Sequence, residues 1–99
     1  MRLAFDDEHL RRLYEEAGFN HPRFGRDLVR SFRKKVNLIG AATNEFELRQ
    51  HKALHLEKLK GDRDGQHSIR LNGQYRLILR FDTDDDGKIV VVIEIVDYH

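Results

Sequence analysis

The chain of 99 residues provides material for one hydrophobic core, and we expect a single domain over residues 1–99. It contains no cysteine, which excludes disulfides and thiolate metal sites, and no apolar stretch approaches the ~20 residues that span a bilayer. The net charge of +1 counts mildly against a nucleic-acid partner, although basic residues gather in 23–35 and 52–80.

The N-terminal sequence predicts a short strand followed by an amphipathic helix. The expected strand covers residues 2–5, and the start of the chain lacks the apolar region of a secretory signal, so we expect a cytoplasmic protein without membrane contact. The helix shows apolar residues at the spacing of one buried face, and Gly18 is its expected end. These apolar residues are Leu10, Leu13, Tyr14 and Ala17.

A second amphipathic helix is predicted from Asn20, its expected N-cap, to Gly40, its expected end. Pro22 falls in the first turn, where a missing N–H costs little. The buried stripe consists of Phe24, Leu28, Phe32, Val36 and Ile39. Four arginines fall on a neighbouring face, for which a solvated helix side is the simplest interpretation. They are Arg23, Arg26, Arg30 and Arg33.

The C-terminal half changes from helical to alternating patterns after a short third helix predicted over residues 43–50. Asn72-Gly73 marks a hairpin turn, and a three-residue loop pairs Ile69 with Leu77 so that one consistent face is apolar. We therefore predict an α+β fold. Two or three N-terminal helices pack on one face of a three- to four-stranded antiparallel sheet.

This register places Arg70 opposite Arg76, with Arg80 on the same face, away from the core. Like charges directly opposite each other are destabilising, but an anion such as phosphate can lie between two guanidinium groups. The alternative is that these are three solvated arginines with acidic neighbours such as Glu94. The pattern alone leaves both interpretations open.

Basic residues also surround the turn Leu59 to Gly65, where Lys58, Lys60 and Arg63 could bind phosphate or belong to a polar loop. The sequence DTDDDG over residues 82–87 matches only the first half of a calcium loop, so an acidic hairpin turn is predicted there. Six histidines show no zinc-binding spacing. We expect no metal site.

The chain ends in a predicted buried strand that finishes near Val96 and is followed by Asp97, Tyr98 and His99. These three residues carry groups that can move or orient protons. Alone, they are a weak signal. The simplest structural alternative is that Tyr98 covers the core, Asp97 pairs with an arginine and His99 frays.

Two segments together resemble the HigB branch of the RelE toxin superfamily. The members of this branch are bacterial toxins encoded beside a helix-turn-helix antitoxin, HigA. The segments are LKGDRDGQHSIRLNGQYRLILRF over residues 59–81 and EIVDYH over residues 94–99. The basic turn, the HSIR and QYR strands and the terminal DYH occur in that order, which makes the combination specific. Over the N-terminal helices the match is looser, although their order and lengths agree.

The resemblance implies a ribosome-dependent endoribonuclease that cleaves mRNA in the decoding site and inhibits translation. In such enzymes the ribose 2′-OH attacks the adjacent phosphate, giving a 2′,3′-cyclic phosphate and a free 5′-OH. This reaction needs a base, an acid and cations that stabilise the phosphorane. It requires no metal and no other cofactor.

Carried over by position, the resemblance implies catalytic roles for Arg76 and for the terminal Asp97, Tyr98 and His99. It implies RNA contacts by Lys60 and Arg70. The expected RNA-binding residues are completed by His55, Lys58, Arg63, His67 and Arg80. His67 stands where other members have Trp, and His55 lies further from the LKG turn than in the common HPLKG form.

The resemblance also implies three partners: the ribosome, mRNA and a cognate HigA-like antitoxin. Operator DNA would be contacted only indirectly, through that antitoxin. One alternative is a non-catalytic, degenerate toxin that only binds the antitoxin and co-represses their operon. Another is a gyrase-poisoning relative, which shares the fold but lacks the DYH ending.

Overall fold

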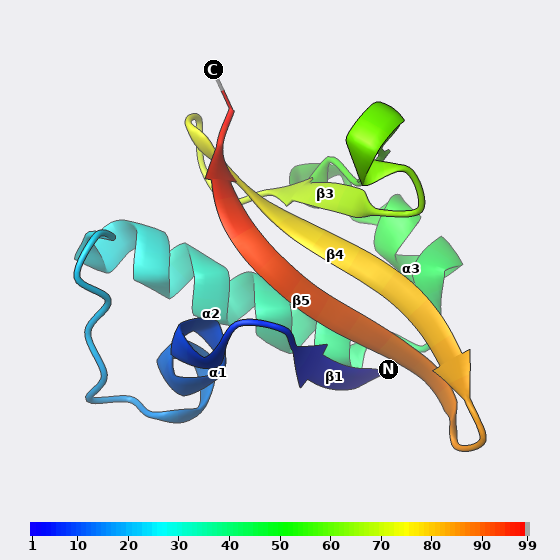
Figure 1. The fold of residues 1–99 in the computed structure, drawn as a ribbon, viewed down its shortest axis with the longest axis horizontal. Coiled ribbons are helices and arrows are strands. Elements are labelled where there is room, and N and C mark those ends of the chain that lie inside the picture. Colours follow the sequence, from blue (N-terminus) through cyan, green and yellow to red (C-terminus); the bar gives the residue numbers. More distant parts are fainter. Residues whose placement is uncertain (99) are drawn as a thin grey trace.

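The computed structural model describes residues 1–98, which form one five-stranded sheet with helices on one side (Figure 1). The helices are α1 (Glu8–Glu15), α2 (Arg26–Ala41) and α3 (Glu45–Gln50), with the 3₁₀ turns η1 (Lys52–Leu54) and η2 (Gly61–Arg63). The strands are β1 (Arg2–Phe5), β2 (Glu57–Lys58), β3 (His67–Arg70), β4 (Tyr75–Asp84) and β5 (Gly87–Asp97). The predicted α+β class is confirmed. No helix in the described part is long and apolar enough to cross a membrane.

The sheet has the order β1-β5-β4-β3-β2, so the prediction of three or four antiparallel strands is wrong at both edges. At one edge β1 pairs with β5 in parallel, joining the two ends of the chain. At the other edge β2 contributes only two residues, which pair with β3. A two-residue strand is too short to show alternation, and a parallel pairing between distant segments has no local sequence signal.

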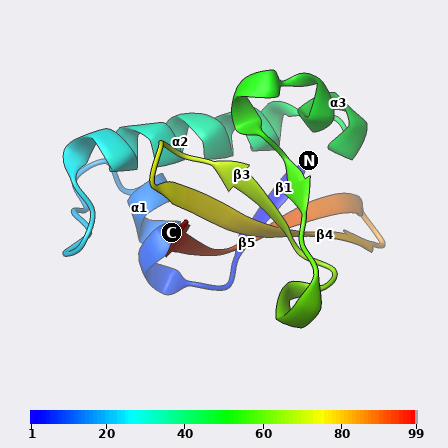
Figure 2. The same cartoon turned by 90° about the horizontal axis from the view of Figure 1, so that it is seen from above.

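The core lies between α2 and one face of the sheet, whereas η2 projects from the other side (Figure 2). Alternation along β4 turns Leu77 and Leu79 toward the helices, as the sequence predicts. The largest fully buried side chains of this core include Leu10, Leu13, Phe32, Val36, Ile39, Ile69, Leu77, Leu79, Val90 and Val92.

Helix α1 begins and ends with identifiable hydrogen bonds. Asp7 caps its N-terminus, because the carboxylate accepts from the backbone N–H groups of His9 and Leu10. At the other end, Nε of Arg33 donates to the carbonyl of Leu13 at 2.7 Å, and its Nη2 reaches the carbonyls of residues 16, 17 and 19. Arg33 is therefore not on a solvated side, and it satisfies carbonyls that the helix end leaves unpaired.

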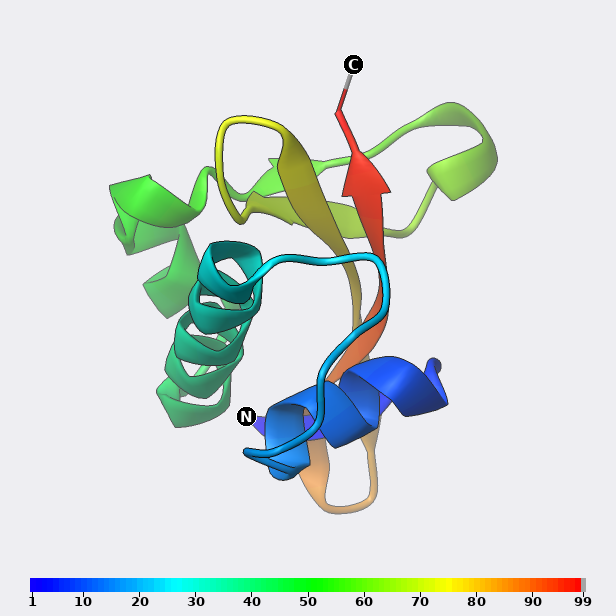
Figure 3. The same cartoon turned by 90° about the vertical axis from the view of Figure 1, so that its left-hand side faces the viewer.

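The start of α2 differs from the prediction. The helix begins at Arg26 with Gly25 as N-cap, so Asn20 is not its cap and Pro22 is not in its first turn. The loop instead passes over the C-terminal half of β5 (Figure 3). Phe24 explains this path, because its ring packs on Tyr75 at 5.6 Å between centroids and on His21 at 4.3 Å. An aromatic contact with the sheet thus overrides the local helix signal.

The β3–β4 hairpin has the predicted register, with Ile69 opposite Leu77 and Arg70 opposite Arg76. The Asn72 side chain accepts hydrogen bonds from the N–H groups of residues 74 and 75 and so closes the loop. The backbone N–H of Tyr98 donates to the carbonyl of Gln74 at 2.7 Å. The C-terminal end of β5 is therefore fixed beside this hairpin. The predicted acidic hairpin turn between β4 and β5 is confirmed.

Candidate active site

Arg76 occupies the centre of the candidate site, and its side chain is only 8% exposed. Its Nε donates to Oγ of Ser68 at 2.8 Å, and its Nη2 donates to the carbonyls of His55 at 2.5 Å and Ser68 at 3.3 Å. The expectation that Arg76 projects from an exposed polar face is wrong. The alternation of side chains along β4 predicted the correct face of the sheet for Arg76. The segment around β2 and η2, however, covers that face.

His55 supports Arg76 through its backbone. Its backbone has φ of 47° and ψ of 53°. Among residues 1–98, it is the one residue other than glycine that has a positive φ. This left-handed conformation costs about 1–2 kcal/mol for an L-residue with a side chain. It follows η1 and aims the His55 carbonyl at the guanidinium group of Arg76. The imidazole itself is on the exposed surface.

Tyr98 completes the mouth of a small pocket at Arg76. The Arg76 guanidinium carbon lies 5.2 Å from the centroid of the Tyr98 ring, and Tyr98 is 60% exposed. The pocket has a volume of about 170 Å³. It is lined by Leu59, Arg63, Ser68, Arg76, Ile78, Val96 and Tyr98. Fixed cationic and hydroxyl groups thus meet a solvent-accessible aromatic ring, within apolar walls.

Glu57 also belongs to this site, although it was not among the predicted residues. Its Oε1 lies 3.9 Å from Nη2 of Arg76, and about half of its side-chain surface is exposed. Glu57 pairs with Ser68 across β2 and β3, so both residues share the face that carries Arg76. The signal that could have identified it is its position three residues before Lys60, beside the basic turn.

The other predicted cations differ in how far their charges are neutralised. Lys58 and Lys60 are exposed and make no ion pair within residues 1–98. Arg70 is exposed and donates from Nε to the Asn72 carbonyl at 3.3 Å. In contrast, Arg63 pairs with Glu94, and Arg80 pairs with Asp82 at 3.0 Å and Asp6 at 3.9 Å. Arg70, Arg76 and Arg80 are therefore not three equivalent free cations.

His67 does not join the group around Arg76. It is 8% exposed and makes an edge-on contact with Phe81, with 4.9 Å between ring centroids. Burial lowers the pKa of His67, and its Nδ1 has no hydrogen-bond partner within residues 1–98. Alternation along β3 explains the separation, since Ser68 faces Arg76 and its neighbour must face the helices.

The last residues of the chain also divide between two faces. Asp97 accepts a hydrogen bond from Nε2 of Gln74 at 3.0 Å and lines a different pocket, together with Phe24 and Tyr75. Tyr98 lies at Arg76. Asp97 is therefore not brought to the Arg76 side. His99 lies outside the described residues.

Comparison with known protein families gives a match over almost the whole chain. Residues 3–99 match the family described as the RelE-like toxin of type II toxin–antitoxin system HigB. The Vibrio cholerae protein named toxin HigB-1 is 33% identical over 81 residues, which cover 82% of this chain and 84% of that protein. An uncharacterized Haemophilus influenzae protein is 33% identical over 84 residues, covering 85% and 82%, respectively.

Two solved structures share the fold. A YoeB/ParE toxin from Agrobacterium tumefaciens aligns over 100% of both chains with a TM-score of 0.58 and 17% identity. A YoeB–YefM complex from Staphylococcus aureus aligns over 100% of this chain and 97% of that one, with a TM-score of 0.53 and 18% identity. The arrangement of helices on one side of a twisted sheet is therefore that of this group of toxins.

Proposed function

We propose that this chain, which belongs to the HigB-like family of RelE-like toxins of type II toxin–antitoxin systems, is a ribosome-dependent endoribonuclease that cleaves mRNA. The observation that carries the proposal is the position of Arg76. Its guanidinium is buried, held by Ser68 and His55, and directed at a pocket whose mouth is formed by Tyr98. RNA cleavage by the 2′-OH needs a fixed cation of this kind at the scissile phosphate.

The proposed role of Arg76 is to stabilise the charge that builds up on the phosphorane. A donor that is held before the substrate arrives needs no reorganisation during the reaction, and this is the main source of electrostatic stabilisation in enzymes. The hydrogen bonds to Ser68 and His55 occupy Nε and Nη2. Nη1 remains the nitrogen from which Arg76 would donate to a phosphate oxygen.

Proton transfer is proposed to involve Glu57 and His99. The Glu57 carboxylate is half-exposed at the edge of the site, where a 2′-OH could approach it. His99 follows Tyr98 directly, and imidazole titrates near neutral pH. One group would accept the 2′-OH proton and the other would protonate the leaving 5′-oxygen. The proposed role of the exposed Tyr98 ring is to stack on a base beside the scissile phosphate.

Substrate delivery is proposed to come from the ribosome rather than from the charge of the protein alone. The net charge of +1 gives weak attraction for free RNA, and Glu94 and Asp82 neutralise two of the arginines near the site. Lys58, Lys60 and Arg70 remain as candidate phosphate contacts. This role places the protein in the cytoplasm with ribosomes and mRNA.

The protein partner follows from the family, since toxins of type II systems are paired with an antitoxin. We propose that the partner is a HigA-like helix-turn-helix protein, through which alone the toxin would reach operator DNA. The solved YoeB–YefM complex shows that a protein of the same fold assembles with a second protein.

The test is brief, tightly controlled expression in a bacterium, followed by mapping of the 5′ ends of cellular mRNAs. Wild type should produce new ends with free 5′-OH groups inside translated codons, and Arg76→Lys should produce few. Absence of such ends in the wild type would overturn the nuclease proposal and favour a non-catalytic antitoxin-binding protein. Ends outside translated regions would overturn the dependence on the ribosome.

A further inference from the structure

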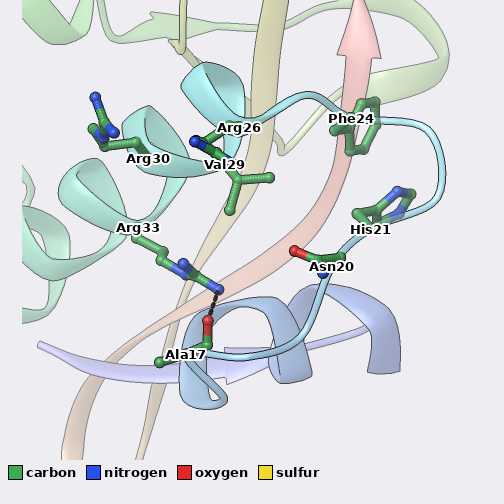
Figure 4. Close-up of a pocket in the computed structure, with 8 residues that line it drawn as sticks. All are labelled: Ala17, Asn20, His21, Phe24, Arg26, Val29, Arg30 and Arg33. Carbon is green, nitrogen blue, oxygen red and sulfur yellow. Dashed lines mark hydrogen bonds between the residues drawn. The ribbon is translucent and has the colours of Figure 1, made fainter.

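A pocket of about 360 Å³ lies away from Arg76, between the loop that follows α1 and the first turns of α2 (Figure 4). We call it the arginine pocket. Three arginines line it from α2, and polar or aromatic residues line it from the loop. These lining residues are Arg26, Arg30, Arg33, Asn20, His21 and Phe24. No acidic side chain lines this pocket within residues 1–98.

Two of the three arginines have charges that the fold does not use. Arg33 points toward the end of α1 and donates to its carbonyls (Figure 4). The Arg26 side chain is exposed and makes no hydrogen bond or ion pair within residues 1–98. Among residues 1–98, the Arg30 side chain has only Asp27 as a charged partner, at 3.9 Å, and the two side chains are 75% and 98% exposed. The pocket therefore carries positive charge that an anion could neutralise.

A second pocket connects the arginine pocket to the C-terminal end of β5. It has a volume of about 440 Å³, and Phe24 lines both pockets. It is also lined by Tyr75, Arg23 and Asp97. Among the lining residues within 1–98, Asp97 is the one with an acidic side chain. The residue after Asp97 is Tyr98, whose ring lies at Arg76. The second pocket and the candidate active site therefore lie on opposite faces at the same C-terminal end of β5.

Aromatic and basic side chains alternate across these two neighbouring pockets. His21 stacks on Phe24, and Phe24 contacts the edge of the Tyr75 ring. Arg23 lies over Phe24, 5.6 Å from its ring centroid. Basic grooves that contain aromatic rings are typical of surfaces that follow a single-stranded nucleic acid. The planar guanidinium group also matches phosphate, with which it can form two parallel hydrogen bonds.

We propose that the arginine pocket binds a backbone phosphate of RNA through Arg26 and Arg30, as a second contact distinct from the one at Arg76. The identity of the polymer rests on the proposed function, because the second pocket ends beside the residue that precedes Tyr98 of the candidate nuclease site. The RNA could belong to the mRNA or to the ribosome, and both present the same phosphodiester. An acidic peptide would also suit two arginines, but it would not need the aromatic side chains.

The experiment measures binding of a labelled single-stranded RNA of about 12 nucleotides, in which 2′-O-methyl groups replace the nucleophile so that it cannot be cleaved. Affinity is recorded between about 50 and 200 mM salt, because each phosphate contact contributes about −0.7 to the slope of log K against log salt. The test variant is Arg26→Gln/Arg30→Gln. The control, Lys34→Gln/Lys88→Gln, removes the same charge from exposed positions that do not line the pocket.

The test variant should bind more weakly and have a slope shallower by about 1.4, for two lost phosphate contacts, whereas the control should keep the wild-type slope. Arg26→Lys/Arg30→Lys should recover most of the slope. All variants should melt at the wild-type temperature, since these side chains are exposed. An unchanged slope in the test variant, or an equal change in the control, would overturn the proposal.

Two further arms identify what binds. Sedimentation with vacant and with mRNA-programmed ribosomes separates the two sources of RNA. If Arg26→Gln/Arg30→Gln binds both kinds of ribosome more weakly than wild type does, the contact is with ribosomal RNA. If it binds only programmed ribosomes more weakly, the contact is with mRNA. Polyglutamate tests the peptide alternative. If Arg26→Gln/Arg30→Gln no longer binds polyglutamate but keeps the wild-type salt slope for the labelled RNA, the proposal is contradicted. Because the labelled RNA cannot be cleaved, failure of the nuclease proposal would appear separately, as wild type that binds this RNA but cleaves no mRNA.

Discussion

The guanidinium of Arg76 donates a 2.5 Å hydrogen bond to the backbone carbonyl of His55, which has a left-handed backbone conformation. A residue with a side chain adopts that conformation only when its surroundings favour it. Here the charged hydrogen bond to a buried arginine provides a reason. The strained residue and the candidate phosphate-binding group are therefore parts of one arrangement.

This arrangement makes a prediction about stability. Arg76→Ala should lower the free energy of unfolding by about 1–3 kcal/mol, because the Ser68 hydroxyl and the His55 carbonyl lose their buried partner. His55→Gly is the matched control, since it keeps the carbonyl and suits the positive φ. Its stability should be equal to or above that of wild type. Denaturant unfolding measures both, and an Arg76→Ala protein as stable as wild type would contradict the account.

Arg33 provides a second prediction, on the attachment of α1. Arg33→Ala should destabilise the protein by about 1–2 kcal/mol, because carbonyls at the end of α1 lose a charged donor. Lys34→Ala, at the next and exposed position of α2, should change stability by less than about 0.5 kcal/mol. Thermal unfolding of the two variants compares them directly. Equal melting temperatures would show that Arg33 is only a surface charge.

The burial of His67 leads to a prediction of how the stability of the protein depends on pH. Burial lowers its pKa below the ordinary value of 6.5, so the unfolded chain binds protons more readily than the folded protein. Stability should therefore fall as the pH drops below about 6.5 toward the folded pKa. His67→Leu should lose less stability than wild type between about pH 7.5 and 5.5, whereas His51→Gln, at an exposed position, should behave like wild type. An identical pH dependence in His67→Leu would show that another group is responsible.

Features that depend on neighbouring residues were the ones predictable from sequence. The opening strand, the short third helix and the β3–β4 register each follow from alternation, capping or turn residues, and the structure contains them. The start of α2 could not be predicted, because the contact of Phe24 with Tyr75 joins residues far apart in the chain. The same is true of β1, whose partner is the last strand.

For the candidate site, the sequence predicted a role for Arg76, which stays a prediction, but it did not indicate the surroundings of this side chain. The burial of Arg76 depends on Leu59 and Tyr98, which reach it from distant parts of the chain. The face on which Glu57 lies could not be predicted, because a two-residue strand is too short to show alternation. The separation of Asp97 from Tyr98, in contrast, was predictable, since adjacent residues of a strand point to opposite faces.

The proposed proton transfer by His99 predicts a large kinetic effect without a structural one. Deletion of His99 should reduce cleavage by roughly 10²–10⁴-fold, the usual contribution of general acid–base catalysis. The melting temperature should barely change, because the buried part of β5 ends before Asp97. Single-turnover cleavage and a thermal melt of the deletion variant measure the two effects. A normal rate would remove His99 from the mechanism, and a large melting shift would make its role structural.

The central claim is that Arg76 stabilises the transition state of mRNA cleavage on the ribosome. The most direct test is single-turnover cleavage of an mRNA on programmed ribosomes, comparing wild type with Arg76→Lys and using the same mRNA free in solution as reference. Wild type should cleave programmed mRNA efficiently and free mRNA poorly. Arg76→Lys keeps the charge but loses the fork that reaches both its supports and the phosphate, so its rate should fall by about 10²–10³-fold. Equal rates for the two proteins would contradict the account.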